Sequence, residues 1–279
     1  MIANITAAEV NKLRQQTGAG MMDCKKALVE ADGDFENAID ILRKKGQKLA
    51  LKRAEKNANE GIVLARTTED KTFGLIFMLN CETDFVAKNQ EFIDFAQNVV
   101  NLALEKKPSS LDELSALMLK GRTVAEGVTD LIGKTGEKME LSHYEFIQTE
   151  KVYAYNHQGN RLATLIGFSG SNHEGLDAIG HEVTMQIAAM NPIAIDKGDV
   201  SQEMINREIE VGKEQAREEG KPEEMLEKIA LGKLNKFYKE NTLLNQEFIR
   251  DSSLTVGEYL AKADKGLKVI AFKRLMLGA

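Results

Sequence analysis

The feature that most constrains how this chain can fold is the run Phe73–Leu79, in which every residue except Gly74 is apolar. An apolar run of this length between polar residues predicts a buried strand. Beyond the polar segment Asn80–Asn89, apolar residues recur with the spacing of one helical face, at positions 92, 95, 96, 99 and 103. The sequence therefore predicts a buried strand followed by an amphipathic helix, with Asn80–Asn89 as the junction.

The junction reads NCETDFVAKN. A strand-to-helix junction can hold one side chain outward on a rigid base, and here that side chain would be Phe85, with Asp84 beside it. The local alternative is that Thr83 or Asp84 caps the helix while Phe85 packs inward as a hydrophobic staple. Taken alone, this window favours the staple.

Composition narrows the class of protein. With 279 residues, of which 43% are hydrophobic and 29% charged, the chain can form more than one packed unit. Its net charge of -6 argues against nucleic acid as the principal ligand, although a local basic patch stays open. Its 2 cysteines form no paired motif, which suits a reducing compartment. Because the sequence shows neither a signal segment nor a long apolar run, we expect a cytoplasmic protein that does not enter a membrane.

The first part of the chain predicts a compact bundle of three short helices. A capping box, Thr6-Ala7-Ala8-Glu9, starts the first helix, and glycines punctuate the next two boundaries. We expect the third helix to end at Gly46. Adjacent residues of a helix cannot both face one core, so we expect one of Met21 and Met22 to be exposed. An exposed methionine would suit a docking surface.

Basic residues crowd the stretch Arg43–Lys56, which Glu55 alone opposes. Such a segment could contact RNA, but no aromatic residues interleave for base stacking. A solvated connector is the favoured interpretation, and it places a domain boundary near residue 55.

Beyond the connector, the sequence predicts two related units, each a strand hairpin followed by a helix, and then a projecting helical hairpin. Gly220-Lys221-Pro222 separates the two charged helices of this hairpin, since glycine ends a helix and proline starts one. The expected seam holds Ile205, Ile209, Gly212 and Ala216 on one helix and Leu226, Ile229, Lys233 and Phe237 on the other. The fold class is α+β, with parts at residues 1–54, 55–140, 141–200 together with 241–279, and 201–240.

Catalytic chemistry has no signature in this sequence. It contains no glycine-rich phosphate loop, no His-Glu-x-x-His and no serine elbow. The histidines at positions 143, 157, 173 and 181 are scattered, and the pair His173 and His181 lacks a third metal ligand. We therefore expect no enzyme, no metal site and no cofactor of its own.

Two stretches resemble the signature segments of a known family. Residues 17–28 read TGAGMMDCKKAL and residues 80–87 read NCETDFVA. In this order they resemble bacterial translation elongation factor Ts, and the resemblance extends over nearly the whole chain. It implies that the N-terminal bundle is a ubiquitin-associated-like module. It also implies that the chain is a guanine-nucleotide exchange factor for elongation factor Tu.

The resemblance further implies which residues contact the partner. The matching positions are Arg14, Met21, Met22, Thr83, Asp84, Phe85, Val86, Ile132, Gly133 and His157. The bundle would dock on the GTPase domain of Tu, and Phe85 would insert near its magnesium site and disturb the Mg²⁺ and phosphate groups that hold GDP. The metal and the nucleotide would thus belong to the partner. Ile132, Gly133 and His157 match less directly, because the alignment with the family has a gap before them.

One departure and two rival functions stay open. Some family members continue beyond the equivalent of Gly278 into a helical module that touches Tu again, so we expect a weaker contact or a homodimer here. The helical hairpin could meet Tu, a second copy, or neither. The rivals are a non-exchanging adaptor that uses the bundle to bind peptides and an RNA-associated protein that uses Arg43–Lys56. The exchange factor is the favoured interpretation, with no direct contact to nucleic acid.

Overall fold

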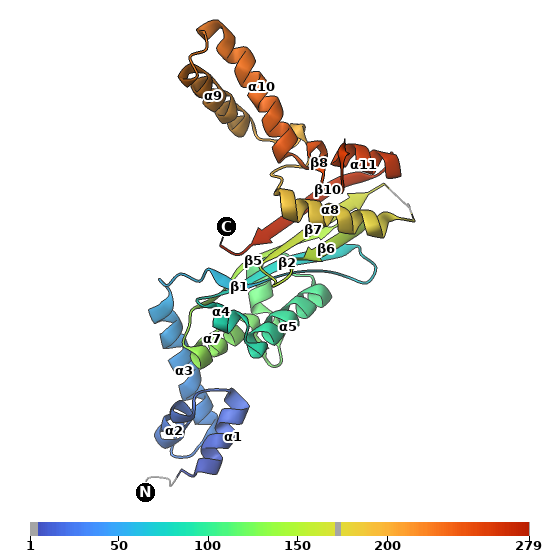
Figure 1. Cartoon of the computed structure of the whole chain (residues 1–279). Helices are drawn as coiled ribbons and strands as arrows, with labels where there is room; N and C mark the ends of the chain where they lie inside the picture. Colours follow the sequence, from blue (N-terminus) through green and yellow to red (C-terminus); the bar gives the residue numbers. More distant parts are fainter. Residues whose placement is uncertain (1–4, 171–173, 279) are drawn as a thin grey trace. The chain divides into compact units, whose positions relative to one another are not determined.

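A computed structural model describes residues 5–170 and 174–278 and shows an α+β fold, which confirms the predicted class (Figure 1). The described residues divide into two compact units. The first lies within Met1–Leu64, Phe77–Glu145 and Met276–Ala279, and the second within Ala65–Ile76 and Phe146–Leu275. The division of the chain into four parts stays a prediction.

The first unit begins with a bundle of α1 (Ala7–Thr17), α2 (Met21–Glu30) and α3 (Phe35–Arg53). Thr6 caps α1 in the predicted capping box, and Gly18 ends this helix in the left-handed region with φ 69°. The bundle closes on a small core formed by Val10, Leu13, Ala19, Cys24, Ala27, Leu28 and Ala38.

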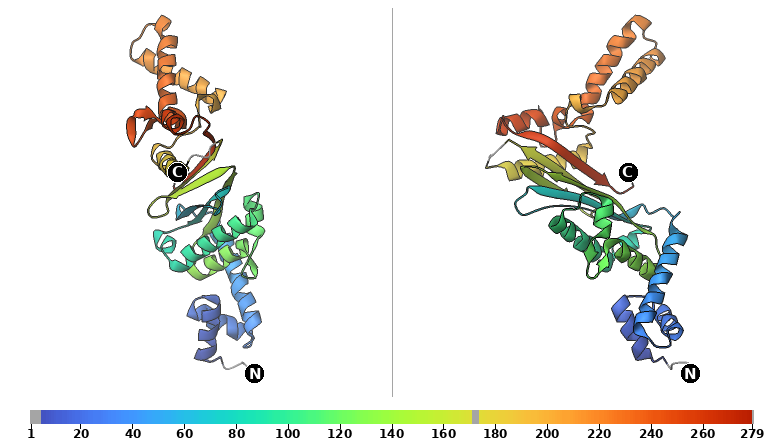
Figure 2. Two further views of the ribbon diagram at one scale, coloured as in Figure 1. Left: turned by 90° about the vertical axis from the view of Figure 1, so that its right-hand side faces the viewer. Right: turned by 180° about the vertical axis from the view of Figure 1, so that it is seen from behind.

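A sheet of order β1-β2-β5 follows the bundle, and its strands β1 (Glu60–Thr67), β2 (Phe73–Cys81) and β5 (Met139–Gln148) have residues in both units. Every residue of β2 is buried, as the apolar run predicts. In the first unit, α5 (Gln90–Lys106) and α7 (Val124–Thr135) lie on one face of the sheet (Figures 1 and 2). The remaining elements of this unit are α4 (Asp84–Ala87), α6 (Leu111–Ala116), β3 (Met118–Leu119) and β4 (Arg122–Thr123).

Helix α3 does not end at Gly46, so that expectation is wrong. The helix continues to Arg53, and Gly46 is buried where α3 packs on α7. A Cβ atom at Gly46 would lie 3.1 Å from the carbonyl oxygen of Thr129 and 3.6 Å from Cα of Gly133. Glycine serves here to let two helices approach, and this contact outweighs its weak helix propensity.

A second sheet, of order β10-β7-β6, is built from β6 (Lys151–Asn156), β7 (Leu162–Ser169) and β10 (Lys268–Met276), and all of it except Met276 belongs to the second unit. Strand β10, near the end of the chain, thus lies beside β7. Helix α8 (Leu176–Met190) packs on β6 and β7. His173, one of the four histidines, lies outside the described residues. The other elements are η1 (Lys197–Asp199), η2 (Leu243–Asn245), β8 (Glu247–Phe248), β9 (Asp251–Thr255) and α11 (Val256–Ala263).

The predicted helical hairpin is formed by α9 (Gln202–Glu218) and α10 (Glu223–Asn241). Its seam on α9 includes Gly212 and Ala216, as expected. On α10 the buried residues are Leu226, Ala230 and Leu234, of which the sequence predicts only Leu226, while the predicted Ile229, Lys233 and Phe237 are half-buried beside them. Lys233 instead donates to Gln215 at 2.9 Å and Glu219 at 3.4 Å along the exposed edge.

The two roots of the hairpin are fastened to each other. The backbone N–H of Ile193 donates to the carbonyl of Asn241, and the N–H of Leu243 donates to the carbonyl of Ala194, each at 2.9 Å. The fully buried side chain of Gln246 donates to the carbonyl of Glu240 at 2.9 Å. The hairpin therefore leaves the second unit through a closed base. None of the helices that the structure describes is long and apolar enough to cross a membrane.

Candidate partner-binding site

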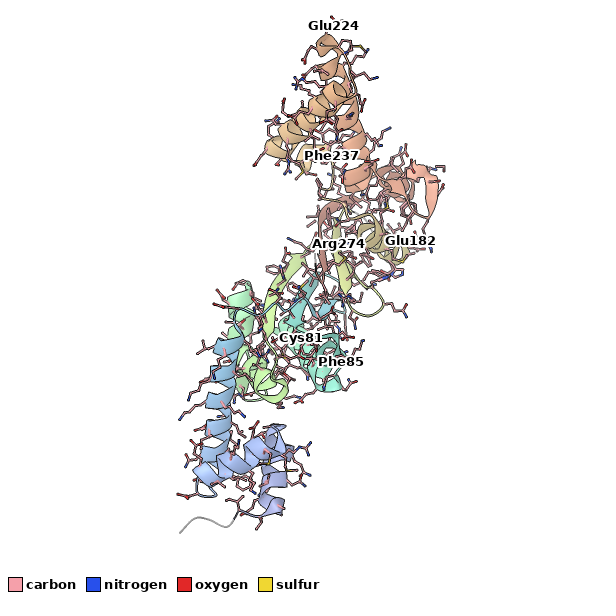
Figure 3. All side chains as sticks on the ribbon, turned by 60° about the vertical axis from the view of Figure 1, so that its left-hand side comes forward. Cys81, Phe85, Glu182, Glu224, Phe237 and Arg274 are labelled. Carbon is pink, nitrogen blue, oxygen red and sulfur yellow. The ribbon has the colours of Figure 1, made fainter. Side chains whose placement is uncertain are left out.

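The junction after β2 presents Phe85 to solvent (Figure 3). Its side chain is 81% exposed, the highest fraction among the large apolar side chains of the described residues. The hydrophobic staple is therefore wrong. The cap is confirmed for Thr83, whose Oγ1 accepts a hydrogen bond from the N–H of Val86 at 3.4 Å and starts α4. Val86 itself is half-buried.

Behind Phe85, the chain is tied to the turn that follows α7. The carboxylate of Glu137 accepts hydrogen bonds from Thr83 Oγ1 at 2.7 Å and from Thr83 N at 3.1 Å. The carboxylate of Glu82 in turn accepts from the N–H of Lys138 at 2.5 Å. Arg53 Nη1, at the end of α3, donates to both carboxylate oxygens of Glu82 at 3.1 and 3.3 Å. Sequence reasoning missed these supporting residues.

Beside the ring, Asp84 carries a fixed negative charge. The ammonium of Lys88 donates to its carboxylate at 2.6 Å, and this hydrogen bond holds the pKa of Asp84 below its ordinary value. The carboxylate is therefore ionised at neutral pH. The exposed end of the junction thus offers an apolar ring with one charged oxygen group next to it.

Cys81 lies at the start of the junction but has no reactive role there. It is fully buried, and its thiol donates to the carbonyl of Thr83 at 3.2 Å. Burial, reinforced by the carboxylates of Glu137 and Glu60, raises the pKa of Cys81 to about 12. Because the thiolate is the nucleophilic form, this cysteine serves packing rather than chemistry.

The predicted docking residues of the bundle lie on its surface. Arg14 is exposed in the last turn of α1, and Met21 and Met22 are 44% and 61% exposed at the start of α2. The sequence predicts exposure for one of the two, and the structure exposes both, because the buried positions of α2 begin one turn later, at Cys24. Both methionines are consequently accessible to a partner.

Three predicted contact residues have different surroundings. Ile132 is 4% exposed, and Gly133 packs against Gly46, whose Cα would lie 3.3 Å from a Cβ atom at position 133. His157 is exposed in the turn between β6 and β7, where its Nδ1 shares a hydrogen bond with the Tyr155 hydroxyl at 2.8 Å. Their roles toward a partner stay predictions.

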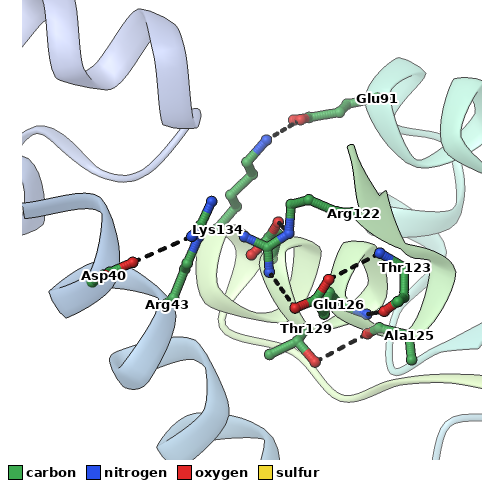
Figure 4. Close-up of polar contacts among 10 residues, drawn as sticks. Asp40, Arg43, Glu91, Arg122, Thr123, Ala125, Glu126, Thr129 and Lys134 are labelled. Atoms are coloured by element: carbon green, nitrogen blue, oxygen red, sulfur yellow. Dashed lines mark hydrogen bonds and ion pairs between the residues drawn. The ribbon is translucent and has the colours of Figure 1, made fainter. Parts of the chain in front are cut away.

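Polar contacts fix α7 ahead of the Glu137 turn (Figure 4). Arg122 Nε lies 3.2 Å from the carboxylate of Asp130, and its guanidinium also approaches Glu126 at 3.9 Å. Burial raises the pKa of Asp130 from its ordinary value, and the charges of Arg122 and Arg43 oppose this shift. Lys134, near the end of α7, pairs with Glu91.

The described residues contain no group of three or more His, Cys, Asp or Glu side chains arranged to hold a metal ion. The exposed apolar features of the first unit include the aromatic ring of Phe85 on its tied base and the methionine pair, Met21 and Met22, on the bundle.

Comparison with known proteins supplies the family. The family model described as "Elongation factor TS" matches residues 82–279. Proteins named elongation factor Ts from Amoebophilus asiaticus and Cytophaga hutchinsonii are each 52% identical to this chain, covering 99% of it and 99% and 100% of their own lengths. The protein of the same name from Porphyromonas gingivalis is 50% identical and covers 99% of each chain.

Proposed function

The chain belongs to the elongation factor Ts family of translation elongation factors, and from that premise we propose that it is a guanine-nucleotide exchange factor for elongation factor Tu in the cytoplasm. The observation that carries the proposal is Phe85, which projects from a tied base with 81% of its side chain exposed. Exchange of this kind breaks no covalent bond in the factor or the nucleotide. The protein acts by binding alone and needs no cofactor of its own.

The energetic requirement is a preference for Tu without nucleotide over Tu with GDP. GDP is held by Mg²⁺ and by backbone amides around its phosphates, so a factor that disturbs both groups loosens the nucleotide. By linkage, if this protein lowers the affinity of Tu for GDP by a given ratio, GDP lowers the affinity of Tu for this protein by the same ratio. Each tenfold change in GDP affinity corresponds to about 1.4 kcal/mol of coupling free energy.

Phe85 alone cannot supply a large coupling. Burying one phenylalanine contributes roughly 1.5–3 kcal/mol, which is one to two powers of ten in affinity. The remainder must come from the loss of Mg²⁺ and from the docking of the bundle through Arg14, Met21 and Met22. Phe85 and the bundle are therefore complementary parts of the surface with which this protein binds Tu.

The direct test measures the release of fluorescently labelled GDP from Tu after addition of this protein. We expect a large acceleration, and we expect Phe85→Ala to reduce it by about 10- to 100-fold while the circular dichroism spectrum stays unchanged. Leu51→Ala is the matched control, because Leu51 is a similarly exposed apolar residue, 78% exposed on α3. Unchanged GDP release on adding the parent protein would reject the proposal.

The same assay separates the rival functions. A non-exchanging adaptor would bind its partner without altering GDP release. An RNA-associated protein would bind RNA with an affinity that falls steeply with salt, because phosphate contacts release counterions.

A further inference from the structure

Two carboxylates cross between the segment before Phe85 and the turn after α7. Glu137 accepts the N–H and the hydroxyl of Thr83, and Glu82 accepts the N–H of Lys138. Each segment thus lends a carboxylate to the backbone of the other. We call Glu82, Thr83, Glu137 and Lys138 the carboxylate clasp.

Helix α4 cannot set the direction of Phe85 by itself. It has 4 residues, all of them described, and buries none of them. A single helical turn is unstable in isolation, because it fixes several dihedral angles for one hydrogen bond. The ties at the start of α4 therefore contribute to the orientation of Phe85.

The clasp is suited to provide these ties. Hydrogen bonds to ionised carboxylates are stronger than those between neutral groups. The side chain of Glu82 is 17% exposed, so solvent competes little for its contacts, and Arg53 adds a charged third tie from α3. The contact with the N–H of Lys138 holds Glu82, and the contacts with the carboxylate of Glu137 hold Thr83.

We propose that Glu82 and Glu137 are positioning residues that hold Phe85 in one direction, ready for insertion into the partner. The part that concerns exchange rests on the proposed function, whereas the part that concerns the orientation of residue 85 does not. Neither carboxylate needs to touch the partner in this role.

The orientation is tested in the free protein. The sequence contains 0 tryptophans, so Phe85→Trp creates a unique fluorescent reporter at the tip of the junction. In this background, we expect Glu137→Ala to lower the residual fluorescence anisotropy of Trp at position 85, because the ring sweeps a wider cone. Glu140→Ala is the control, since it removes a neighbouring carboxylate that pairs with the ammonium of Lys138 at 3.1 Å. Equal anisotropy in the parent and Glu137→Ala proteins would overturn the clasp.

The consequence for exchange is tested by a double-mutant cycle. We expect Glu137→Ala to slow GDP release at saturation about tenfold. Combined with Phe85→Ala, it should add little further loss, because both changes remove the same positioned ring. Glu137→Gln keeps one acceptor oxygen for the Thr83 hydroxyl and should recover part of the rate. It also serves as the second variant if Glu137→Ala fails to fold. Independent, multiplying effects of the two substitutions would contradict the positioning role.

The two measurements separate the two claims. A loosened reporter together with no exchange by the parent protein rejects the proposed function and leaves the clasp standing. A fixed reporter together with a strong Phe85→Ala effect rejects the clasp and leaves the proposed function standing.

Discussion

At the residue scale, Cys81 shows how burial near a functional segment removes a reactive group. Burial raises the pKa of Cys81 to about 12, so the proton stays on the sulfur at neutral pH. The thiolate, which is the reactive form, is therefore disfavoured at neutral pH. The residue beside the binding motif is thereby protected from oxidation and alkylation.

We therefore expect no rapid thiol labelling of the native protein at pH 8. Cys24 is also fully buried, so both cysteines should react with a disulfide reagent such as DTNB only after unfolding in guanidinium. The measurement is the absorbance of the released thiolate in native and denatured samples. Stoichiometric labelling within the mixing time of the native sample would show that the junction opens.

Phe85 shows which parts of a site local sequence can give. The Thr83 cap is predictable, because its partner is three residues away. The exposure of Phe85 is not, because it depends on α4 ending before a new helix starts at Gln90 under the cap of Asn89. This break takes Phe85 off the apolar face of α5. Glu137 escapes prediction for a different reason, since 54 residues separate it from Thr83.

At the element scale, the helical hairpin depends on close approach at Gly212. A Cβ atom there would lie 3.1 Å from Cα of Ala230, whereas one at Gly232, in the same hairpin, would meet nothing within 4 Å. We expect Gly212→Leu to destabilise the protein by about 1–3 kcal/mol through overpacking. Gly232→Leu should be neutral or stabilising by up to about 1 kcal/mol, because leucine favours helix over glycine.

Urea denaturation of the two leucine variants measures this difference. Since the substitutions are chemically identical and lie in facing helices, helix propensity cancels between them. Equal midpoints for both variants would mean that α9 and α10 do not pack through Gly212.

The sequence predicts most elements and misses those that tertiary contacts decide. The strands around Phe73–Leu79 and the hairpin break at Gly220 follow from periodicity and turn residues. The run of α3 through Gly46 depends on α7, far along the chain. The seam of α10 is ambiguous from periodicity, because Ile229 lies next to Ala230 and Phe237 lies one helical turn after Leu234, so two overlapping apolar stripes fit the sequence.

At the scale of the whole molecule, the proposed function divides docking from displacement. Met21, Met22 and Phe85 are all exposed. In the proposed function the two methionines support affinity for Tu, whereas Phe85 supports the displacement of GDP. We expect the double variant Met21→Ala, Met22→Ala to raise the concentration for half-maximal exchange roughly tenfold, from the loss of apolar contact area. Its maximal rate should stay close to that of the parent.

Phe85→Ala should give the opposite pattern, with a lower maximal rate and a smaller change in half-saturation. Both patterns are read from GDP release measured over a range of factor concentrations. If the methionine variant lowered the maximal rate as strongly as Phe85→Ala, the two regions would act as one, and the division would fail.

The family and the fold class are predictable at this scale, because two long motifs and the order of elements are written in the sequence. The division of single strands between the two units is not predictable. Periodicity shows where β2 begins and ends, but not that Phe73–Ile76 belongs to one packed unit and Phe77–Cys81 to the other. That distribution is decided by contacts between segments distant in the chain.

The closed base of the hairpin has a practical consequence for engineering. Because hydrogen bonds such as that between Ile193 and Asn241 already hold the two roots together, any chain inserted between them costs little additional closure entropy. Residues 201–240 are therefore a suitable place at which to replace one domain by another. An affinity module or a fluorescent domain whose termini lie close together can replace the helical pair there, with the sheet and its helices as an undisturbed scaffold.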